Sequence, residues 1–182
     1  MPDAATGILS QAPPHPRRFV TSHDEQGNAI FKIEGDIPHT QFYKSEEECA
    51  VFHVPWTTEG LPVTVSDTGD RAVTKAGGSL ARENGIVCRY VDFPPNTFSP
   101  MHRTHNHSYN LLTMTSGVVI FGDLELVLDN GETRQMTQSD VVVQRGTIHQ
   151  WNNKTDKWAR MMFVLIASDP VMIDGKPLPS NL

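Results

Sequence analysis

The chain reads as short runs of alternating or β-branched apolar residues separated by turn-forming residues, most clearly from residue 85 onward. Runs of this kind cover residues 86–93, 109–115, 118–121, 124–128, 141–144 and 159–166. Asn130-Gly131 follows the fourth run, and this dipeptide between two strands is a strong hairpin signal. Because helical periodicity is almost absent, the pattern predicts an all-β sandwich or barrel.

The first half of the chain is less regular. Residues 1–16 hold four of the 13 prolines, which predicts a flexible arm. Residues 17–23 and 29–33 predict two short strands around a turn at 24–28. Residues 34–85 are interrupted by proline and glycine, with one helical turn expected at Ser45–Cys49. We therefore divide the chain into an arm (1–16), strands and loops that pack on the core (17–85), and the β core with its tail (86–182).

Composition narrows the class of protein. With 182 residues, 38% hydrophobic and 20% charged, the chain is expected to form one globular domain. Its net charge is −6 and its Lys and Arg residues are scattered, which argues against a nucleic-acid or membrane-surface partner. No apolar run approaches about 20 residues, so we expect neither a transmembrane span nor a signal peptide. Cys49 and Cys88 are far apart, which predicts two free thiols in a reducing, cytoplasmic setting.

Four of the eight histidines lie in two short segments with apolar flanks, His102, His105 and His107 in the first and His149 in the second. Neutral imidazole is the commonest metal ligand in proteins. Several imidazoles around an open position suit Fe, Zn, Cu or Ni better than Mg or Ca. The other four histidines, at positions 15, 23, 39 and 53, are interpreted as structural.

The two segments resemble the motifs of the cupin superfamily. Residues 139–152, with Gly146, His149 and Asn152, match the second motif, although Ser139 replaces its first glycine and Gln144 its proline. The resemblance covers about residues 86–166 and implies a double-stranded β-helix, or jelly-roll barrel. It does not select a reaction, because cupins include oxygenases, lyases, isomerases and non-catalytic binding proteins.

The first cupin motif allows two alignments. One makes His102 the first ligand and places Thr104 at the second, whereas the other restores the usual pair with His105 and His107. Both lack the acidic ligand of the family. The resemblance therefore implies a divalent transition-metal site that uses His107 and His149, with His105 and His102 competing for the third position, and no organic cofactor.

The leading hypothesis is a small-molecule enzyme that transforms an oxygenated organic substrate, such as a polyketide-like or phenolic acid, by dioxygenation or Lewis-acid chemistry. A metal-free lyase or isomerase using His102 or His149 as acid or base is the first alternative, and a non-catalytic ligand-binding cupin is the second. Expected catalytic residues are His102, Arg103 and Tyr109. Expected substrate contacts are Met101, Met114, Phe121, Arg145 and Trp151.

The expected partners are the substrate and a second copy of the chain. The predicted hairpin at residues 17–33 could extend the sheet of a neighbouring molecule and cover an exposed strand edge. A homodimer is therefore expected.

Overall fold

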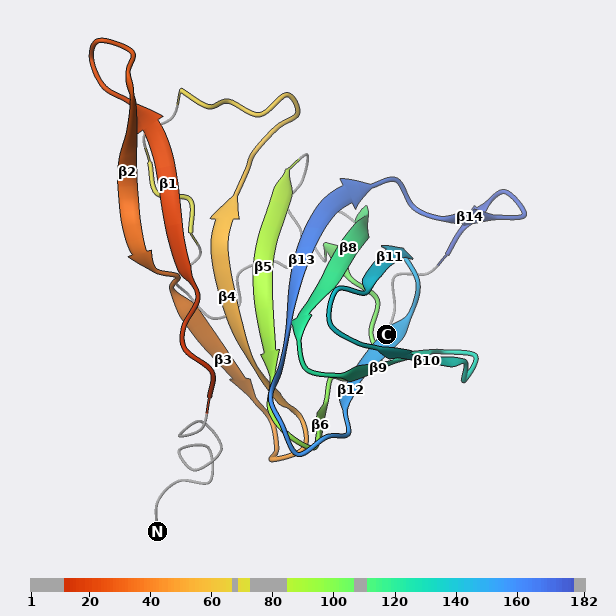
Figure 1. Ribbon diagram of the computed structural model, residues 1–182. Helices are drawn as coiled ribbons and strands as arrows, with labels where there is room; N and C mark the ends of the chain where they lie inside the picture. The colour runs from red at the N-terminus through yellow and green to blue at the C-terminus, as the bar shows by residue number, and fades with distance from the viewer. Residues whose placement is uncertain (1–11, 67–68, 73–84, 107–110, 179–182) are drawn as a thin grey trace.

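The computed structural model describes residues 12–66, 69–72, 85–106 and 111–178, which form 15 strands and no helix (Figure 1). The first eight strands are β1 (Arg17–His23), β2 (Ala29–Asp36), β3 (His39–Tyr43), β4 (Cys49–Thr57), β5 (Ile86–Phe93), β6 (Thr97–Phe98), β7 (His105–Asn106) and β8 (Leu111–Phe121). The others are β9 (Leu124–Leu128), β10 (Thr133–Met136), β11 (Val141–Arg145), β12 (His149–Asn153), β13 (Ala159–Ser168), β14 (Met172–Ile173) and β15 (Lys176–Pro177).

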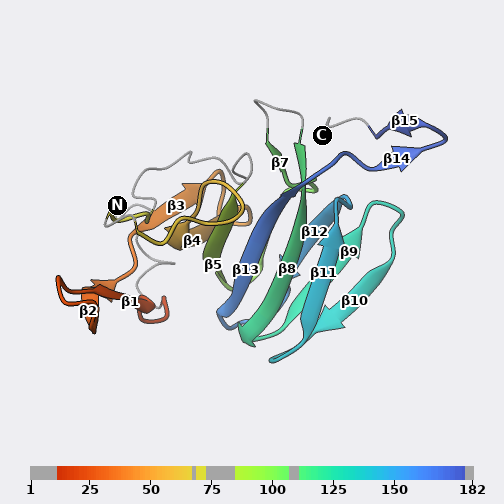
Figure 2. The ribbon, with the colours of Figure 1, turned by 90° about the horizontal axis from the view of Figure 1, so that it is seen from above.

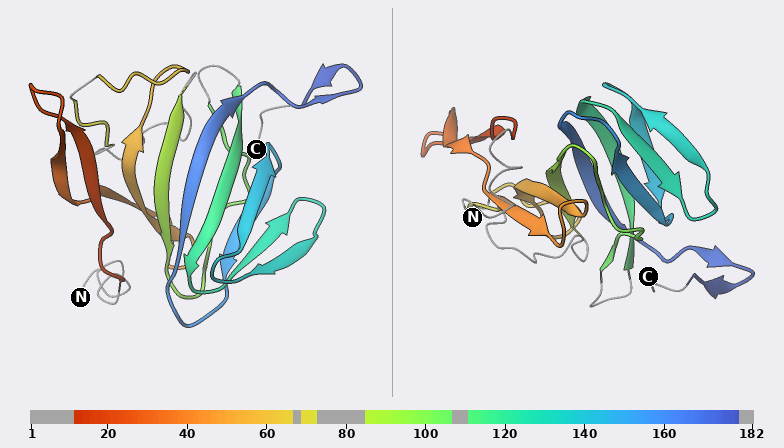
Figure 3. Two further views of the ribbon diagram at one scale, coloured as in Figure 1. Left: turned by 45° about the horizontal axis from the view of Figure 1, so that its top comes forward. Right: turned by 90° about the horizontal axis from the view of Figure 1, so that it is seen from below.

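Two antiparallel sheets face each other. The larger has the order β11-β8-β13-β5-β4-β3, with β7 beside β8, and the smaller has the order β10-β9-β12-β6. Figures 2 and 3 show the smaller sheet lying across one end of the larger one. Both sheets contribute to one core cluster, for example Met161 and Phe163 from β13 and Leu124 and Trp151 from the smaller sheet. This arrangement is the expected all-β jelly-roll barrel.

Strand β8 is longer than the sequence predicts, because the two runs expected at 109–115 and 118–121 are continuous in the structure. Gly117 lies in the middle of this strand and does not interrupt it. A Cβ atom at Gly117 would lie 2.7 Å from the ring of Phe163. Glycine therefore allows β8 and the aromatic ring on β13 to pack closely.

The helical turn expected at Ser45–Cys49 is wrong. Residues 44–48 form the tight connection between β3 and β4, in which Lys44 N–H donates to the carbonyl of Glu48 at 3.0 Å. Glu48 N–H donates to Ser45 Oγ at 3.0 Å. The Lys44–Glu48 bond runs from an N–H to the carbonyl four residues later, the reverse of the helical direction, so it closes a turn between two strands and not a helix.

The hairpin β1–β2 forms a separate two-stranded sheet at the side of the barrel, beyond β3 (Figure 1). Its turn is closed by the Asp24 carboxylate, which accepts hydrogen bonds from the backbone N–H groups of Gln26 and Asn28. Arg18 attaches the hairpin to β4 by donating to the carbonyl of Pro55 at 3.0 Å. No helix in the described part of the chain is long and apolar enough to cross a membrane.

Candidate functional site

His102 and His149 face each other across two antiparallel segments. The backbone N–H of each donates to the carbonyl of the other at 2.9 Å, and the two ring centroids are 4.5 Å apart. His149 begins β12 and lies on the same face as Trp151, which belongs to the core cluster. The pair therefore sits inside the barrel, at one end of the smaller sheet.

The fold fixes which nitrogen of each ring is available. His102 Nδ1 lies 2.8 Å from the carbonyl oxygen of Pro100, and His149 Nδ1 lies 3.0 Å from that of Thr147. A carbonyl can only accept, so both Nδ1 atoms carry the proton and both Nε2 atoms keep a free electron pair. Metal-binding histidines are commonly oriented by such a bond from the other ring nitrogen.

Burial keeps both rings neutral. The pKa of His149 falls to about 4, first because the ring is buried and then because of the nearby charges of His102 and Arg89. The pKa of His102 is lowered mainly by burial, with a smaller contribution from Arg89. At neutral pH both rings are therefore unprotonated at Nε2, the form that binds a metal ion.

Arg89 is a functional candidate that the sequence analysis missed. It lies on β5 between Val87 and Val91 of the core cluster, on the same face of the strand. Its guanidinium carbon is 5.1 Å from the centroid of the Phe52 ring, and burial lowers its pKa to about 10. A cation thus remains inside the barrel at neutral pH. An arginine in phase with the apolar side of a strand is the signal that could have identified it.

Gln144 is a second missed candidate, at the position where the cupin motif has proline. It is buried on β11, in phase with Val142, which packs on the core, and opposite Thr115 of β8. Neither its amide oxygen nor its amide nitrogen has a hydrogen-bond partner among the described residues. Buried amides are normally satisfied, so this side chain offers both a donor and an acceptor to a molecule inside the barrel.

The predicted substrate contacts are distributed over different faces. Trp151 lies in the core with its ring centroid 6.4 Å from that of His149, and Met101 is half-buried beside His102. Met114 and Arg145 are exposed and pair across β8 and β11 on the opposite face. Of these four residues, only Trp151 belongs to the core of the barrel.

Two further predicted residues lie next to other groups. Phe121 lies under the guanidinium of Arg160 at 5.4 Å, on the outer side of the larger sheet. Arg103 follows His102 directly and is half-buried.

The third metal ligand stays a prediction. His107 and Tyr109 lie outside the described residues. His105 begins β7, and its backbone pairs with Leu112 of β8. The acidic ligand of the family is not replaced by Glu125, whose carboxylate pairs with Lys154 at 2.6 Å.

Three histidines interpreted as structural come together elsewhere. His15, His39 and His53 each offer a nitrogen that lies within 4.8 Å of the others. His39 and His53 are cross-strand partners in β3 and β4. These histidines are 24 and 14 positions apart in the sequence, so no local motif indicates that they meet. Only the strand register could have predicted the group.

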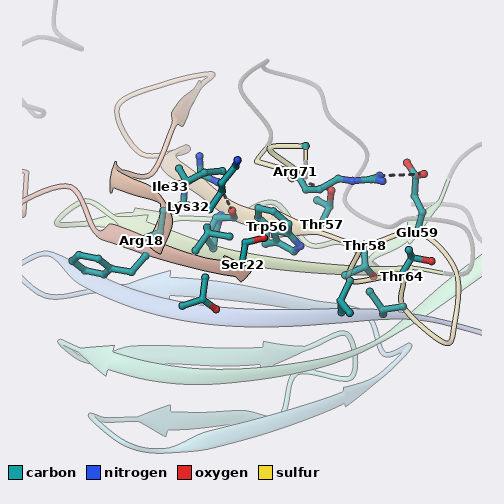
Figure 4. Close-up of a pocket in the computed structure, with 17 residues that line it drawn as sticks. Arg18, Ser22, Lys32, Ile33, Trp56, Thr57, Thr58, Glu59, Thr64 and Arg71 are labelled. Carbon is teal, nitrogen blue, oxygen red and sulfur yellow. Dashed lines mark hydrogen bonds and ion pairs between the residues drawn. The ribbon is translucent and has the colours of Figure 1, made fainter. Parts of the chain in front are cut away.

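A cavity of about 650 Å³ lies between the hairpin β1–β2 and β4 (Figure 4). Lys32, Trp56 and Thr64 are among its lining residues, and an ion pair of 3.2 Å between Arg71 and Glu59 lies at its side. It shares no residue with the His102–His149 pair. We place the candidate site inside the barrel and not in this cavity, because the groups with strongly lowered pKa values, His149 and Arg89, lie in the barrel beside His102.

Comparisons with known proteins identify the family, although no protein-family model matches the chain. The chain is 37% identical over 171 residues to phomopsin biosynthesis cluster protein C' of Diaporthe leptostromiformis, covering 90% of this chain and 84% of that protein. It is 37% identical over 162 residues to the cupin-domain-containing oxidoreductase virC of Hypocrea virens, covering 86% and 78%. A solved cupin-2 domain protein of Rhodospirillum rubrum aligns with 74% of this chain and 76% of its own, with 11% identity and a TM-score of 0.47.

The names of several relatives support an enzyme. Two cupin-domain-containing relatives are 37% and 34% identical to this chain over most of its length, and the two facing sheets have the fold expected of that family. The chain therefore belongs to the cupin superfamily.

Proposed function

We propose that this cupin is an oxidoreductase that holds a divalent transition metal at the His102–His149 pair and oxidises an oxygenated organic small molecule. The observation that carries the proposal is the cross-strand pair, in which backbone carbonyls occupy both Nδ1 atoms and leave both Nε2 atoms available. The oxidoreductase names of the relatives favour redox chemistry over the other cupin reactions. Relatives named after phomopsin and oryzine biosynthesis clusters favour a substrate from secondary metabolism.

The proposed ligand set is neutral. His102 and His149 supply two imidazoles, and His105, His107 or both complete the site. Without an acidic ligand the full charge of the ion remains, which favours substrates that present an anionic or polarisable oxygen. Such a metal supplies Lewis-acid activation of that oxygen and, as iron or copper, redox chemistry.

The residues of the chain itself bind and orient the substrate. Arg89 keeps its charge in the interior and pairs with a carboxylate or an enolate, a charge-assisted bond that is strong away from water. Gln144 offers a donor and an acceptor to a carbonyl or hydroxyl group. Trp151 supplies an apolar wall beside His149. These three contacts suit a phenolic, polyketide-like or β-dicarbonyl acid.

The electrostatics weigh against the metal-free alternative. A general acid must be protonated in the resting enzyme, whereas the pKa of His149 near 4 keeps it neutral at physiological pH. A base with so low a pKa also has little driving force to accept a proton. Metal ligation uses the neutral form directly, so the same shift favours it.

Elemental analysis of tag-free protein tests the proposal. We expect bound iron, copper, nickel or zinc in the parent and about one equivalent less of it in His149→Ala. We expect no change in His23→Ala, a substitution at an exposed position of β1. Equal metal content and affinity in the parent and His149→Ala would overturn the proposal. Oxygen consumption with phenolic and β-dicarbonyl acids then separates an oxygenase from other redox enzymes.

We also propose a cytoplasmic homodimer joined through the hairpin β1–β2. Among the described residues this sheet has two strands only, and it exposes Phe19 (53%) and Phe31 (66%), whose rings meet at 6.2 Å. Paired exposed aromatic rings on an open sheet edge are typical of a contact surface. The two free cysteines are compatible with a reducing compartment.

A further inference from the structure

A second group of imidazoles lies outside the barrel, on the opposite face of the larger sheet. His53 alternates along β4 with Phe52 and Val54, which pack on the core, so its ring points away from the barrel interior. His39 is its direct partner on β3, with ring centroids 5.7 Å apart. His15, from the segment before β1, stacks on His39 at 4.3 Å and meets His53 edge-on at 5.4 Å.

The fold holds the segment around His15 in place on both sides. The carbonyl of Pro14 accepts a hydrogen bond of 3.0 Å from the guanidinium of Arg160. The carbonyl of Pro16 accepts one of 2.9 Å from the backbone N–H of Ile37. His15 is thus fixed against the sheet by bonds at the residues before and after it, although its own ring is exposed.

The hydrogen bonds of His53 leave one nitrogen without a partner. Its Nε2 lies 3.0 Å from a carboxylate oxygen of Asp92, and the same carboxylate accepts bonds from Nε and Nη2 of Arg160. The carboxylate acts as an acceptor, so His53 Nε2 carries a proton, and in the neutral ring Nδ1 keeps the electron pair. Nδ1 is buried, His53 has no exposed surface, and no described residue bonds to Nδ1.

This arrangement matches the requirements of a nitrogen-rich metal site. A carboxylate that receives the second N–H of a ligating histidine is a recurrent feature of zinc centres. Zinc accepts three imidazoles with bonds of about 2.0–2.1 Å, which places the nitrogens about 3.4 Å apart in a tetrahedron. The three nitrogens here lie within 4.8 Å of one another, and the exposed rings of His15 and His39 can turn to close the difference.

We propose that His15, His39 and His53 form a second metal site, which binds one Zn²⁺ or a similar nitrogen-preferring divalent ion on the outer face of the larger sheet. Asp92 is a positioning residue that orients His53. The fourth coordination position is left to water. The ion connects the segment before β1 to strands β3 and β4, so its binding also stabilises the fold. This site is independent of the proposed barrel function.

The test removes the barrel site first. The full-length, tag-free double variant His102→Ala/His149→Ala is treated with a chelator and titrated with Zn²⁺ and, separately, with Co²⁺. We expect about one equivalent of bound ion, a rise in Tm with Zn²⁺, and visible Co²⁺ absorption typical of a four-coordinate site. Adding His15→Ala or His39→Ala should remove all three signals, whereas adding His23→Ala should remove none.

Asp92→Asn tests the positioning role in the same background. We expect an affinity for Zn²⁺ about 10–100-fold weaker with unchanged stoichiometry. If burial of the altered side chain prevents folding, the two exposed positions, His15 and His39, still decide the question. The proposal is overturned if the double variant binds no Zn²⁺, or if His15→Ala and His39→Ala bind it as tightly as their parent. Neither result bears on the barrel site, which all these variants lack.

Discussion

The low pKa of His149 predicts a specific loss of stability in acid. In the folded protein the pKa of His149 falls from 6.5 to about 4. Between these two pH values the unfolded chain is protonated at His149 and the folded protein is not, so acid favours unfolding. The neutral ring therefore favours folding fully above about pH 6.5, and this contribution is lost as the pH falls towards 4. Between about pH 7 and pH 4.5 the loss from this group alone is about 2 kcal/mol of unfolding free energy.

The variant His149→Gln isolates this contribution. Chelator-treated parent and variant are unfolded with urea at both pH values, with tryptophan fluorescence as the signal. Other groups titrate in the same range, so the relevant quantity is the difference between the two proteins. We expect the variant to lose about 2 kcal/mol less than the parent on acidification. The control His23→Gln, at an exposed position, should lose as much as the parent. Equal losses in the parent and His149→Gln would refute the electrostatic account of the pair.

Three further predictions follow from other parts of the structure. Gly122→Ala should lower the free energy of unfolding, measured in urea, by about 1–3 kcal/mol more than Gly131→Ala does. Both glycines have positive φ, but only at Gly122 would the new Cβ lie 2.7 Å from the backbone of β13. Equal losses in the two variants would contradict this. Arg89→Met should raise KM for an anionic substrate at least tenfold with a smaller change in kcat; an unchanged KM in steady-state kinetics would remove Arg89 from the site. Phe31→Ser should convert a dimer of the 20.2-kDa chain into a monomer in sedimentation experiments, and a monomeric parent would contradict the proposed interface.

The sequence predicts the strands whose signals are local. Residues 86–93 and 124–128 appear as β5 and β9 with the expected bounds, since their runs end at Pro94 and at the Asn130-Gly131 hairpin. Strand β4 was missed because Pro55 lies within it and proline normally excludes a central strand. The structure accommodates Pro55 at an irregularity in the pairing of β4 with β5, between His53 and Trp56. A bulge of this kind depends on the neighbouring strand and leaves no mark in the local pattern.

The candidate site was predictable to the extent that it lies in a motif. His149 follows from the second cupin motif, and His102 is placed opposite it by strand register, which the motif alone does not give. Arg89 and Gln144 face inward because of their positions in the alternation of β5 and β11, and the sequence analysis assigned neither residue to the site. The group of His15, His39 and His53 depends on contacts between three distant segments. The sequence therefore predicts the residues of local motifs, and it does not predict contacts that depend on pairing between distant strands.

The most direct test of the barrel site is an anomalous-scattering map of crystals grown from protein with its native metal, collected on both sides of the absorption edge of the metal found. We expect a peak bound by Nε2 of both His102 and His149, at about 2.0–2.2 Å, with a further histidine completing the shell. The proposed barrel site would be contradicted if these crystals hold stoichiometric metal elsewhere while both Nε2 atoms contact only water or protein.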